Sequence, residues 1–394
     1  MKFLMVLILL VPVSPVQDQS PRTASDYYNR GVARIQQNND PYGTISDFDK
    51  AIELNPRYAQ AYKARARARI HFQADVDGAI SDYNTAIEIN PLDVEAYLHR
   101  GQVRARKADH EGAMADYAKA ITLDPRSTEA YNARGEERRS QHDLDGALED
   151  FTKAIEIDPR NDQAYAHRAD VRHEKKDIDG AIGDYTRAIE INPTHRWAYS
   201  ARARARRDKG DLDGAISDYT KDMEIYPANE VSYISRGELR YAKGEVDGAI
   251  SDYTKAIQLN SYRCEVYHAR GWTFERKGEL QWAIMDYQRA IEIKPNYSPP
   301  YNDLAWLLAT SSRLGIRDGK SAVAYARKAA ELTEWKDASV LDTLAAAYAE
   351  VRNFREAVKW QKKALTFPEF ASREGERARQ RLKLYTGRKP YREK

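Results

Sequence analysis

Apolar and polar positions repeat along most of this chain with a period of about 34 residues. In the block 94–125, Tyr97, Gly101 and Ala105 recur at the spacing of one helix face, and Ala113 and Tyr117 begin a second such run. Each block therefore predicts two helices joined by a tight turn. A proline ends most blocks, because it lacks an N–H and disfavours helix in the residue before it. These closing residues are Pro56, Pro91, Pro125, Pro159, Pro193, Pro227 and Pro295, with Ser261 keeping the phase.

Small residues and aromatic rings at fixed places predict how the two helices of a block pack. The first helix carries Gly or Ala at one place, such as Gly101, and the second carries Ala at two places. Small side chains let the helices approach closely, and a ring from the second helix then fills the seam. The rings are Phe48, Tyr83, Tyr117, Phe151, Tyr185, Tyr219, Tyr253 and Tyr287. Because one such unit cannot bury its apolar face alone, the blocks are expected to stack on one another.

The recurring sequence motif YxxRG…DGAIxDYxxAIxxxP resembles that of the tetratricopeptide repeat (TPR) family over about residues 24–366. The resemblance implies an all-α fold, a right-handed α-solenoid of about ten helix–turn–helix units with a capping helix after the last unit. It also implies a protein-interaction scaffold that binds a protein or peptide in a concave groove lined by the first helices. It does not imply a particular ligand.

The regularity of the pattern divides the chain into four parts. Eight regular units are expected over residues 24–297 and two divergent ones over 298–366, with an insertion of about five residues in the loop 311–320. Residues 367–394 are basic and are expected to form a capping helix and a tail. An anionic partner such as a phospholipid surface is the alternative role for this segment.

Residues 1–20 differ from the repeats. Lys2 precedes an apolar run that extends from Phe3 to Val13, which is too short for an ordinary transmembrane helix. This pattern indicates a signal peptide or an N-terminal anchor, so we expect an exported chain that is periplasmic, secreted or tethered to a membrane. The alternative is a hydrophobic leader on a cytoplasmic protein.

Arginine and aspartate recur together in a way that departs from the usual TPR pattern. Every regular first helix carries one arginine, and every second helix carries an aspartate just before its ring. We expect one ion pair per repeat, among them Arg100–Asp116, Arg134–Asp150, Arg168–Asp184 and Arg202–Asp218. A second arginine lies four residues after the first in seven units, on the same helix face. Glutamates near the repeat ends, such as Glu53, Glu88, Glu156 and Glu190, are candidate partners for this second row.

The arginine rows also suggest a second function, the binding of a polyanion. If the arginines were exposed to solvent, they would form a basic stripe that could bind RNA, an acidic glycan or an anionic lipid. The equal number of aspartates favours internal ion pairs instead. A net charge of only +3, with 31% charged residues, also argues against nucleic-acid binding by bulk charge.

Aromatic residues at groove positions are the main candidates for partner binding. Trp272 and Trp306 lie 34 residues apart, and Tyr241 belongs to the unit before them, so the three rings are expected to form one patch. Tryptophan and tyrosine are frequent among the residues that dominate binding energy. Trp197 and Arg204 are further candidates. Lys63 and Asn132 partly match a set that holds a peptide carboxylate in some TPR proteins, but the full pattern is absent.

The sequence carries no motif for catalysis. It contains no P-loop, GxGxxG, GxSxG, HExxH or CxxC, and its eight histidines are scattered. We therefore expect no enzymatic activity, no cofactor and no metal, and membrane contact only through residues 1–20 or the basic tail. The single cysteine, Cys264, excludes an intramolecular disulfide. A third function is that of an accessory subunit of an envelope enzyme or secretion complex.

Overall fold

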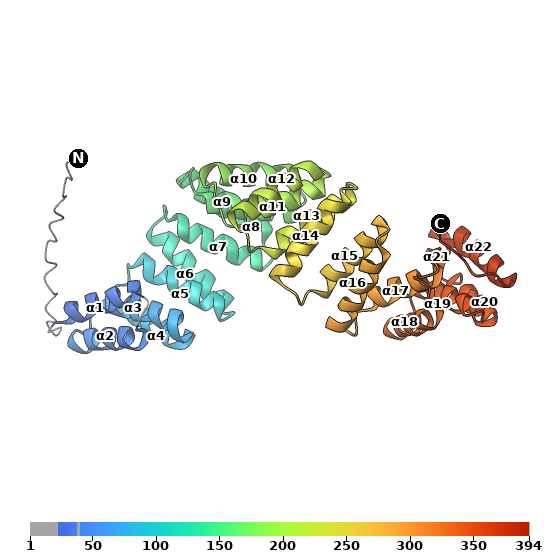
Figure 1. The fold of residues 1–394 in the computed structure, drawn as a ribbon. Coiled ribbons are helices and arrows are strands. Elements are labelled where there is room, and N and C mark those ends of the chain that lie inside the picture. The colour runs from blue at the N-terminus through green and yellow to red at the C-terminus, as the bar shows by residue number, and fades with distance from the viewer. Residues whose placement is uncertain (1–22, 38–39, 394) are drawn as a thin grey trace, which may run out of the picture. The chain divides into compact units, whose positions relative to one another are not determined.

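The computed structural model describes residues 23–37 and 40–393, and all regular secondary structure within them is helical. The chain divides into two compact units, Met1–Ile191 and Asn192–Lys394. Both units are built from antiparallel helix pairs that follow the repeat (Figure 1). The signal-peptide prediction for residues 1–20 falls outside the described residues.

The first unit contains five helix pairs, one for each of the first five blocks. Its helices are α1 (Ala24–Gln37), α2 (Pro41–Leu54), α3 (Ala59–Ala68), α4 (Val76–Ile89), α5 (Val94–Arg106), α6 (His110–Leu123), α7 (Thr128–Ser140), α8 (Leu144–Ile157), α9 (Asp162–Glu174) and α10 (Ile178–Ile191). A π-helical turn, Arg69–Gln73, extends α3. The sequence places one extra residue near His71, and this turn accommodates it.

The second unit contains the remaining pairs and two further helices. They are α11 (Ala198–Lys209), α12 (Leu212–Ile225), α13 (Glu230–Ala242), α14 (Val246–Leu259), α15 (Cys264–Lys277), α16 (Leu280–Ile293), α17 (Ser298–Thr310), α18 (Gly319–Leu332), α19 (Ala338–Glu350), α20 (Phe354–Ala364), α21 (Pro368–Arg373) and α22 (Gly375–Thr386). The helix α22 packs on α20 and α19, so it covers the last full pair.

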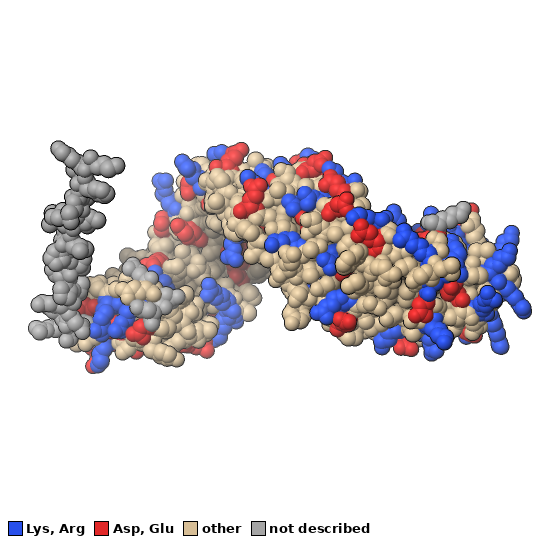
Figure 2. Space-filling view, viewed as in Figure 1, with Lys and Arg blue, Asp and Glu red and all other residues tan. Residues whose placement is uncertain are grey.

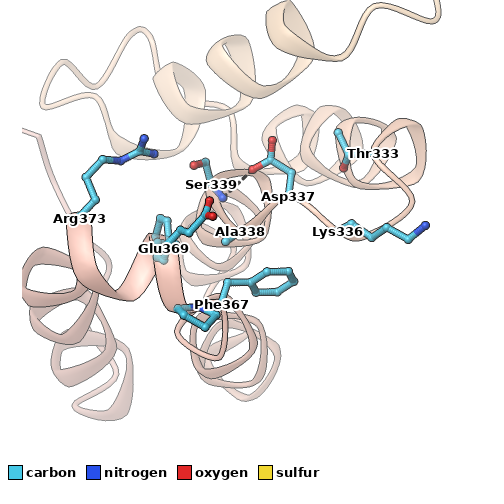
Figure 3. Close-up of a pocket in the computed structure, with 10 residues that line it drawn as sticks. Thr333, Lys336, Asp337, Ala338, Ser339, Phe367, Glu369 and Arg373 are labelled. Carbon is cyan, nitrogen blue, oxygen red and sulfur yellow. Dashed lines mark hydrogen bonds between the residues drawn. The ribbon is translucent and has the colours of Figure 1, made fainter.

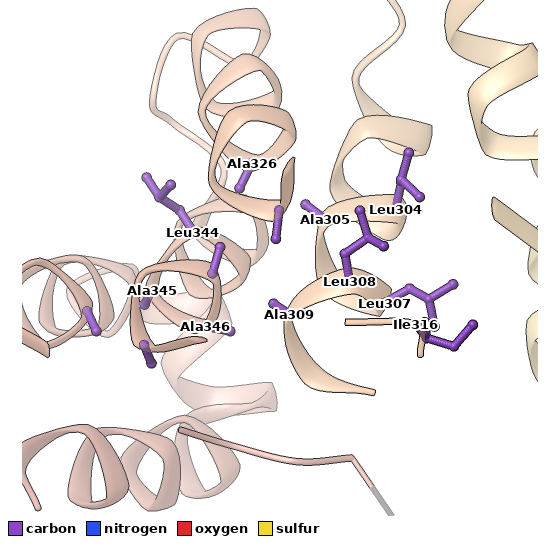
Figure 4. Packing of buried hydrophobic residues seen from close by; sticks show 14 of the residues in the cluster. Leu304, Ala305, Leu307, Leu308, Ala309, Ile316, Ala326, Leu344, Ala345 and Ala346 are labelled. Atoms are coloured by element: carbon purple, nitrogen blue, oxygen red, sulfur yellow. The ribbon is translucent and has the colours of Figure 1, made fainter. Parts of the chain in front are cut away.

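Close packing within each pair follows from the small residues. A Cβ atom on Gly101 would lie 2.6 Å from the Tyr117 ring, and one on Gly271 would lie 2.9 Å from the Tyr287 ring. Both rings are buried. Burying such a side chain contributes about 1.5–3 kcal/mol. At the end of the second unit, leucines and alanines of α17, α18 and α19 form a larger core cluster (Figure 4).

Aspartates start most of the second helices. The side chain of Asp109, for example, accepts a hydrogen bond from the backbone N–H of Gly112 at 3.0 Å. A Cβ atom on Gly112 would lie 2.3 Å from that carboxylate, which explains the glycine of the DGAI wording. Glu245 and Glu279 occupy the same place and make no capping hydrogen bond through their side chains. The longer glutamate side chain does not match this geometry.

The predicted arginine–aspartate pairs lie inside the helix pairs. Arg168 donates from Nε and Nη2 to the two oxygens of Asp184, both at 2.8 Å. Arg202 holds Asp218 in the same bidentate manner, at 2.9 and 2.7 Å. The aspartates are buried. The remaining pairs are Arg30–Asp47, Arg65–Asp82, Arg100–Asp116, Arg134–Asp150, Arg236–Asp252 and Arg270–Asp286.

The second arginine row binds the same aspartates, so the prediction of glutamate partners is wrong. Arg172 Nη1 lies 2.8 Å from Asp184 Oδ2, and six further units share this contact. Three of the four glutamates instead pair with a cation three residues earlier on the exposed surface: Lys50–Glu53, Lys153–Glu156 and Arg187–Glu190. Glu88 follows Thr85 at that spacing, so it has no cation there. The spacing of four residues correctly predicted that the two arginines share a helix face. From neighbouring turns of that helix, both side chains contact the same aspartate.

The first arginine row also connects neighbouring repeats. Arg236 Nη1 donates to the Thr220 hydroxyl of the preceding second helix at 2.9 Å, and Arg270 does the same to Thr254 at 3.0 Å. The ion pairs of Arg236 and Arg270 thus stabilise both their own helix pair and the contact to the pair before it. The arginine rows are therefore structural in the described part of the chain, and no helix there is long and apolar enough to cross a membrane.

Candidate functional site

Two rows of side chains, each with a spacing of 34 residues, lie along the first helices of the second unit. We call the surface that they form the first-helix face. The rows are Arg204, Glu238, Trp272 and Trp306, and Arg207, Tyr241, Glu275 and Ala309. They lie on α11, α13, α15 and α17, one member of each row per helix.

A partly exposed aromatic pair, half-buried Tyr241 and exposed Trp272, lies at the middle of the first-helix face. The rings of Tyr241 and Trp272 are 5.6 Å apart at an angle of 38°, and Trp272 remains 50% exposed. At the equivalent register of the first unit, Arg139 and Asp170 form an ion pair at 2.8 Å. This position between neighbouring first helices therefore holds an ion pair in the first unit and a partly exposed aromatic pair in the second.

Two carboxylates lie on the helix that carries Trp272 and on the next first helix: Glu275 on α15 and Asp303 on α17. Glu275 accepts a hydrogen bond from the Tyr287 hydroxyl at 2.7 Å, and His268 Nε2 lies 2.7 Å from Asp303 Oδ2. Burial raises the pKa of Glu275 to about 7, and the negative charges of Asp303 and Glu393 act in the same direction. This site would favour a cation, since a positive charge would stabilise the ionised form of Glu275.

The third ring of the predicted patch is covered. The Trp306 ring lies 5.9 Å from the ring of Tyr391, and its indole N–H donates to Glu393 at 2.6 Å. Arg381 lies over both rings, 5.4 Å from the centroid of Trp306 and 5.6 Å from that of Tyr391. The prediction of one continuous three-ring patch is therefore wrong. A contact between residues 85 positions apart leaves no trace in the repeat.

The other predicted groove residues are not brought together. Trp197 precedes α11 and makes an edge contact with His195 at 5.0 Å, and Arg204 is exposed on α11. Lys63 is buried in the first unit, where it pairs with Asp93 at 2.9 Å. Asn132 belongs to α7 of the same unit, and its Oδ1 atom is buried without a hydrogen-bond partner. Lys63 is thus already neutralised within the protein.

Cys264 is buried at the start of α15, and burial raises the pKa of its thiol. This is opposite to the shift that activates a cysteine, so Cys264 is a packing residue. Among residues 23–37 and 40–393, no group of three or more His, Cys, Asp or Glu side chains is placed to hold a metal ion.

A separate pocket lies where the loop between α18 and α19 faces α21 (Figure 3). Lys336 and Asp337 come from the loop, and Phe367, Glu369 and Arg373 from the other wall, around about 570 Å³. Asp337 accepts a hydrogen bond from the Ser339 backbone N–H at 2.8 Å, so its carboxylate caps α19. The pocket mixes both charge signs and presents no reactive arrangement.

Family models described as tetratricopeptide repeat match residues 72–128, 132–196 and 265–297. The helix pairs, their period and their packing agree with this match. The chain is a TPR protein. TPR proteins are in general interaction scaffolds that bind a protein or peptide partner, and this chain has that architecture in both units. No curated protein matches the chain by sequence.

Solved structures similar to this TPR protein are themselves distant. A tetratricopeptide repeat protein from Parabacteroides merdae has 17% identity and a TM-score of 0.49, with coverage of 66% of this chain and 98% of that one. YrrB, described as a TPR protein with an unusual peptide-binding site, has 23% identity, a TM-score of 0.41 and coverage of 48% and 97%. MamA has 22% identity, a TM-score of 0.41 and coverage of 43% and 92%.

Sequence reasoning missed the residues that cover the far end of the first-helix face. Glu350 is the last residue of α19 and Arg381 lies on the capping helix α22, and Tyr391, Arg392 and Glu393 follow α22. The sequence contained one indication of these residues. Pro390 follows a helical pattern and favours an extended backbone, so residues 390–392 could be expected to leave the helix. The place where that stretch docks could not be read from its sequence.

Proposed function

We propose that this TPR protein is a non-catalytic scaffold that binds an extended peptide segment of a partner protein on the first-helix face. The contact is centred on Tyr241 and Trp272, in the region that the family resemblance assigns to a concave groove. The partner segment carries a lysine or arginine that lies against the two rings and near Glu275.

The partly exposed Tyr241–Trp272 pair carries this proposal. Tyr241 is half-buried against the core of its own helix pair, whereas Trp272 is half exposed on a polar repeat surface. Packing does not require such an exposed ring, and tyrosine and tryptophan dominate many binding sites. A cation over an aromatic face contributes about 0.5–2 kcal/mol, and the neighbouring carboxylates Glu275 and Asp303 add an attraction of the same sign. The first unit has an ion pair in this register and lacks both features.

The test is capture of partners from the source cells with three versions of the chain. The natural chain is compared with Tyr241→Ala/Trp272→Ala and with Trp282→Ala as a matched control. Trp282 belongs to α16, a second helix, and is 56% exposed. A partner bound by the natural chain and the control but lost with the double variant supports the proposal. A partner retained by all three places the contact elsewhere.

A polyanion remains the second candidate, restricted to one region. The arginine rows are engaged with aspartates, whereas exposed cations gather over α20 and α22 at the end of the second unit (Figure 2). They include Lys362, Lys363, Arg379 and Lys383. Binding to heparin that is lost on neutralising these four residues, with steep salt dependence, would favour this candidate.

Export is proposed from residues 1–20 alone. An exported chain could also act as an accessory subunit of an envelope enzyme or secretion complex. Partner capture separates this role from free peptide binding, because an accessory subunit co-purifies with its enzyme when Tyr241 and Trp272 are replaced.

A further inference from the structure

Residues 389–393 leave the end of α22 as an extended segment and return to the first-helix face. Arg388 takes a left-handed backbone conformation, with φ of 58°, and the Lys389 N–H bonds to the Leu384 carbonyl at 2.9 Å. This ends the helix, and Pro390 then favours an extended chain. The segment reaches α17, more than 80 residues earlier in the sequence.

The segment makes the contacts of a bound peptide. The Glu393 backbone N–H donates to the Thr310 carbonyl at the end of α17 at 2.9 Å, and its carboxylate accepts from the Trp306 indole. Arg392 pairs with Glu350 of α19 at 2.5 Å. Tyr391 packs against both Trp306 and Arg381. One aromatic, one cationic and one acidic side chain in succession are each recognised by a different group.

The receiving surface is held in place without the segment. Arg381 is fixed by buried Asp342, with Nη2 and Oδ2 at 2.8 Å, and Glu350 also pairs with Arg317 at 3.2 Å. The charged groups around Trp306 therefore keep partners when the segment leaves. By contrast, the side chains of Tyr391 and Arg392 are only half-buried, and Glu393 is exposed. A surface that is prearranged around a loosely buried segment is suited to exchange.

We propose that Trp306, Glu350 and Arg381 form a binding site for an extended peptide with an aromatic–arginine–acidic sequence, and that residues 389–393 occupy it within the chain. The inference deepens the proposed peptide-binding role and rests on it, because the site lies at one end of the same first-helix face. A partner carrying the same three side chains would displace the segment and take its place on Trp306, Glu350 and Arg381.

The test measures binding of a labelled synthetic peptide of residues 387–394 by fluorescence anisotropy. The full-length natural chain is compared with the full-length Tyr391→Ala/Arg392→Ala/Glu393→Ala variant. A site that is covered about nine-tenths of the time binds an external ligand about tenfold more weakly, so the variant should bind at least about tenfold more tightly. Adding Trp306→Ala should remove this binding, and the same peptide with alanine for its tyrosine and arginine should not bind.

Equal affinity of the natural and variant chains, including no binding to either, would overturn the proposal. A chain lacking residues 388–394 serves as a second variant, with folding checked by circular dichroism. Loss of the fold in both variants would also overturn it, because the segment would then be a structural cap. Adding Trp272→Ala to the variant should leave peptide affinity unchanged, so failure here is distinguishable from failure of the Tyr241–Trp272 contact.

Discussion

At the scale of single residues, each repeat is stabilised by one buried carboxylate shared by two arginines. Asp184, for example, is held by Arg168 and Arg172. The equal numbers of arginines and aspartates made the first pairing predictable from sequence. The second was assigned to the glutamates because spacing defines a helix face but not the distance that a long side chain spans. Burial makes these pairs costly to break and removes them from the surface.

Replacing Arg168 by alanine should lower the free energy of unfolding by about 3 kcal/mol, because it leaves a buried carboxylate with one partner fewer. The measurement is urea unfolding followed by circular dichroism. Arg187→Ala is the matched control, since Arg187 forms a half-exposed pair with Glu190 and its loss should leave the midpoint unchanged. A midpoint for Arg168→Ala that coincides with the control would refute the structural role of the pair.

The raised pKa of Glu275, about 7, predicts a pH dependence of stability. In the folded protein Glu275 keeps its proton at pH values where the unfolded chain has lost it. The contribution of Glu275 to stability is therefore fully present below the pKa of an ordinary glutamate. It is lost as the pH rises through about 7. Unfolding of Glu275→Gln should therefore depend less on pH between 5 and 8 than that of the natural chain. Parallel pH curves for the two proteins would contradict the shift.

At the scale of elements, the helix pairs follow from the 34-residue pattern, and the turns between their helices follow from backbone conformation. The first helices end in a left-handed residue, which is glycine at Gly210, with φ of 87°, but lysine at Lys176, with φ of 67°. The aspartate that follows, such as Asp211, caps the second helix by accepting a hydrogen bond from the Gly214 N–H at 2.9 Å. The π-helical extension of α3 was not predictable, because an extra residue fits equally well in a turn or in a widened helix.

Replacing Lys176 by glycine should stabilise the chain by about 1 kcal/mol, because glycine adopts the left-handed conformation without the cost that a Cβ atom imposes. The Lys176 side chain is exposed, so little packing is lost. The reciprocal change, Gly210→Ala, should destabilise by a similar amount, since no atom lies within 4 Å of the added Cβ and only the backbone is affected. Thermal unfolding of both variants measures this, and shifts of the same sign would contradict it.

At the scale of the molecule, the two units share one repeat but differ in what their first helices present. The sequence predicted the architecture of both, because local periodicity determines the pairing of neighbouring helices. It predicted Tyr241 and Trp272 as candidates, since both interrupt a polar row. It did not predict that Trp306 is covered, because that contact joins α17 to residues 391 and 393. Long-range docking of an extended segment depends on side-chain complementarity and has no period.

The central claim is that Tyr241 and Trp272 bind the partner, and its most direct test is an affinity measurement with the captured partner. Titration calorimetry should show binding at least about tenfold weaker to Tyr241→Ala/Trp272→Ala than to the natural chain, because loss of such rings typically costs more than about 1 kcal/mol each. The Trp282→Ala control should bind like the natural chain. Equal affinities for the natural chain and the double variant would contradict the account.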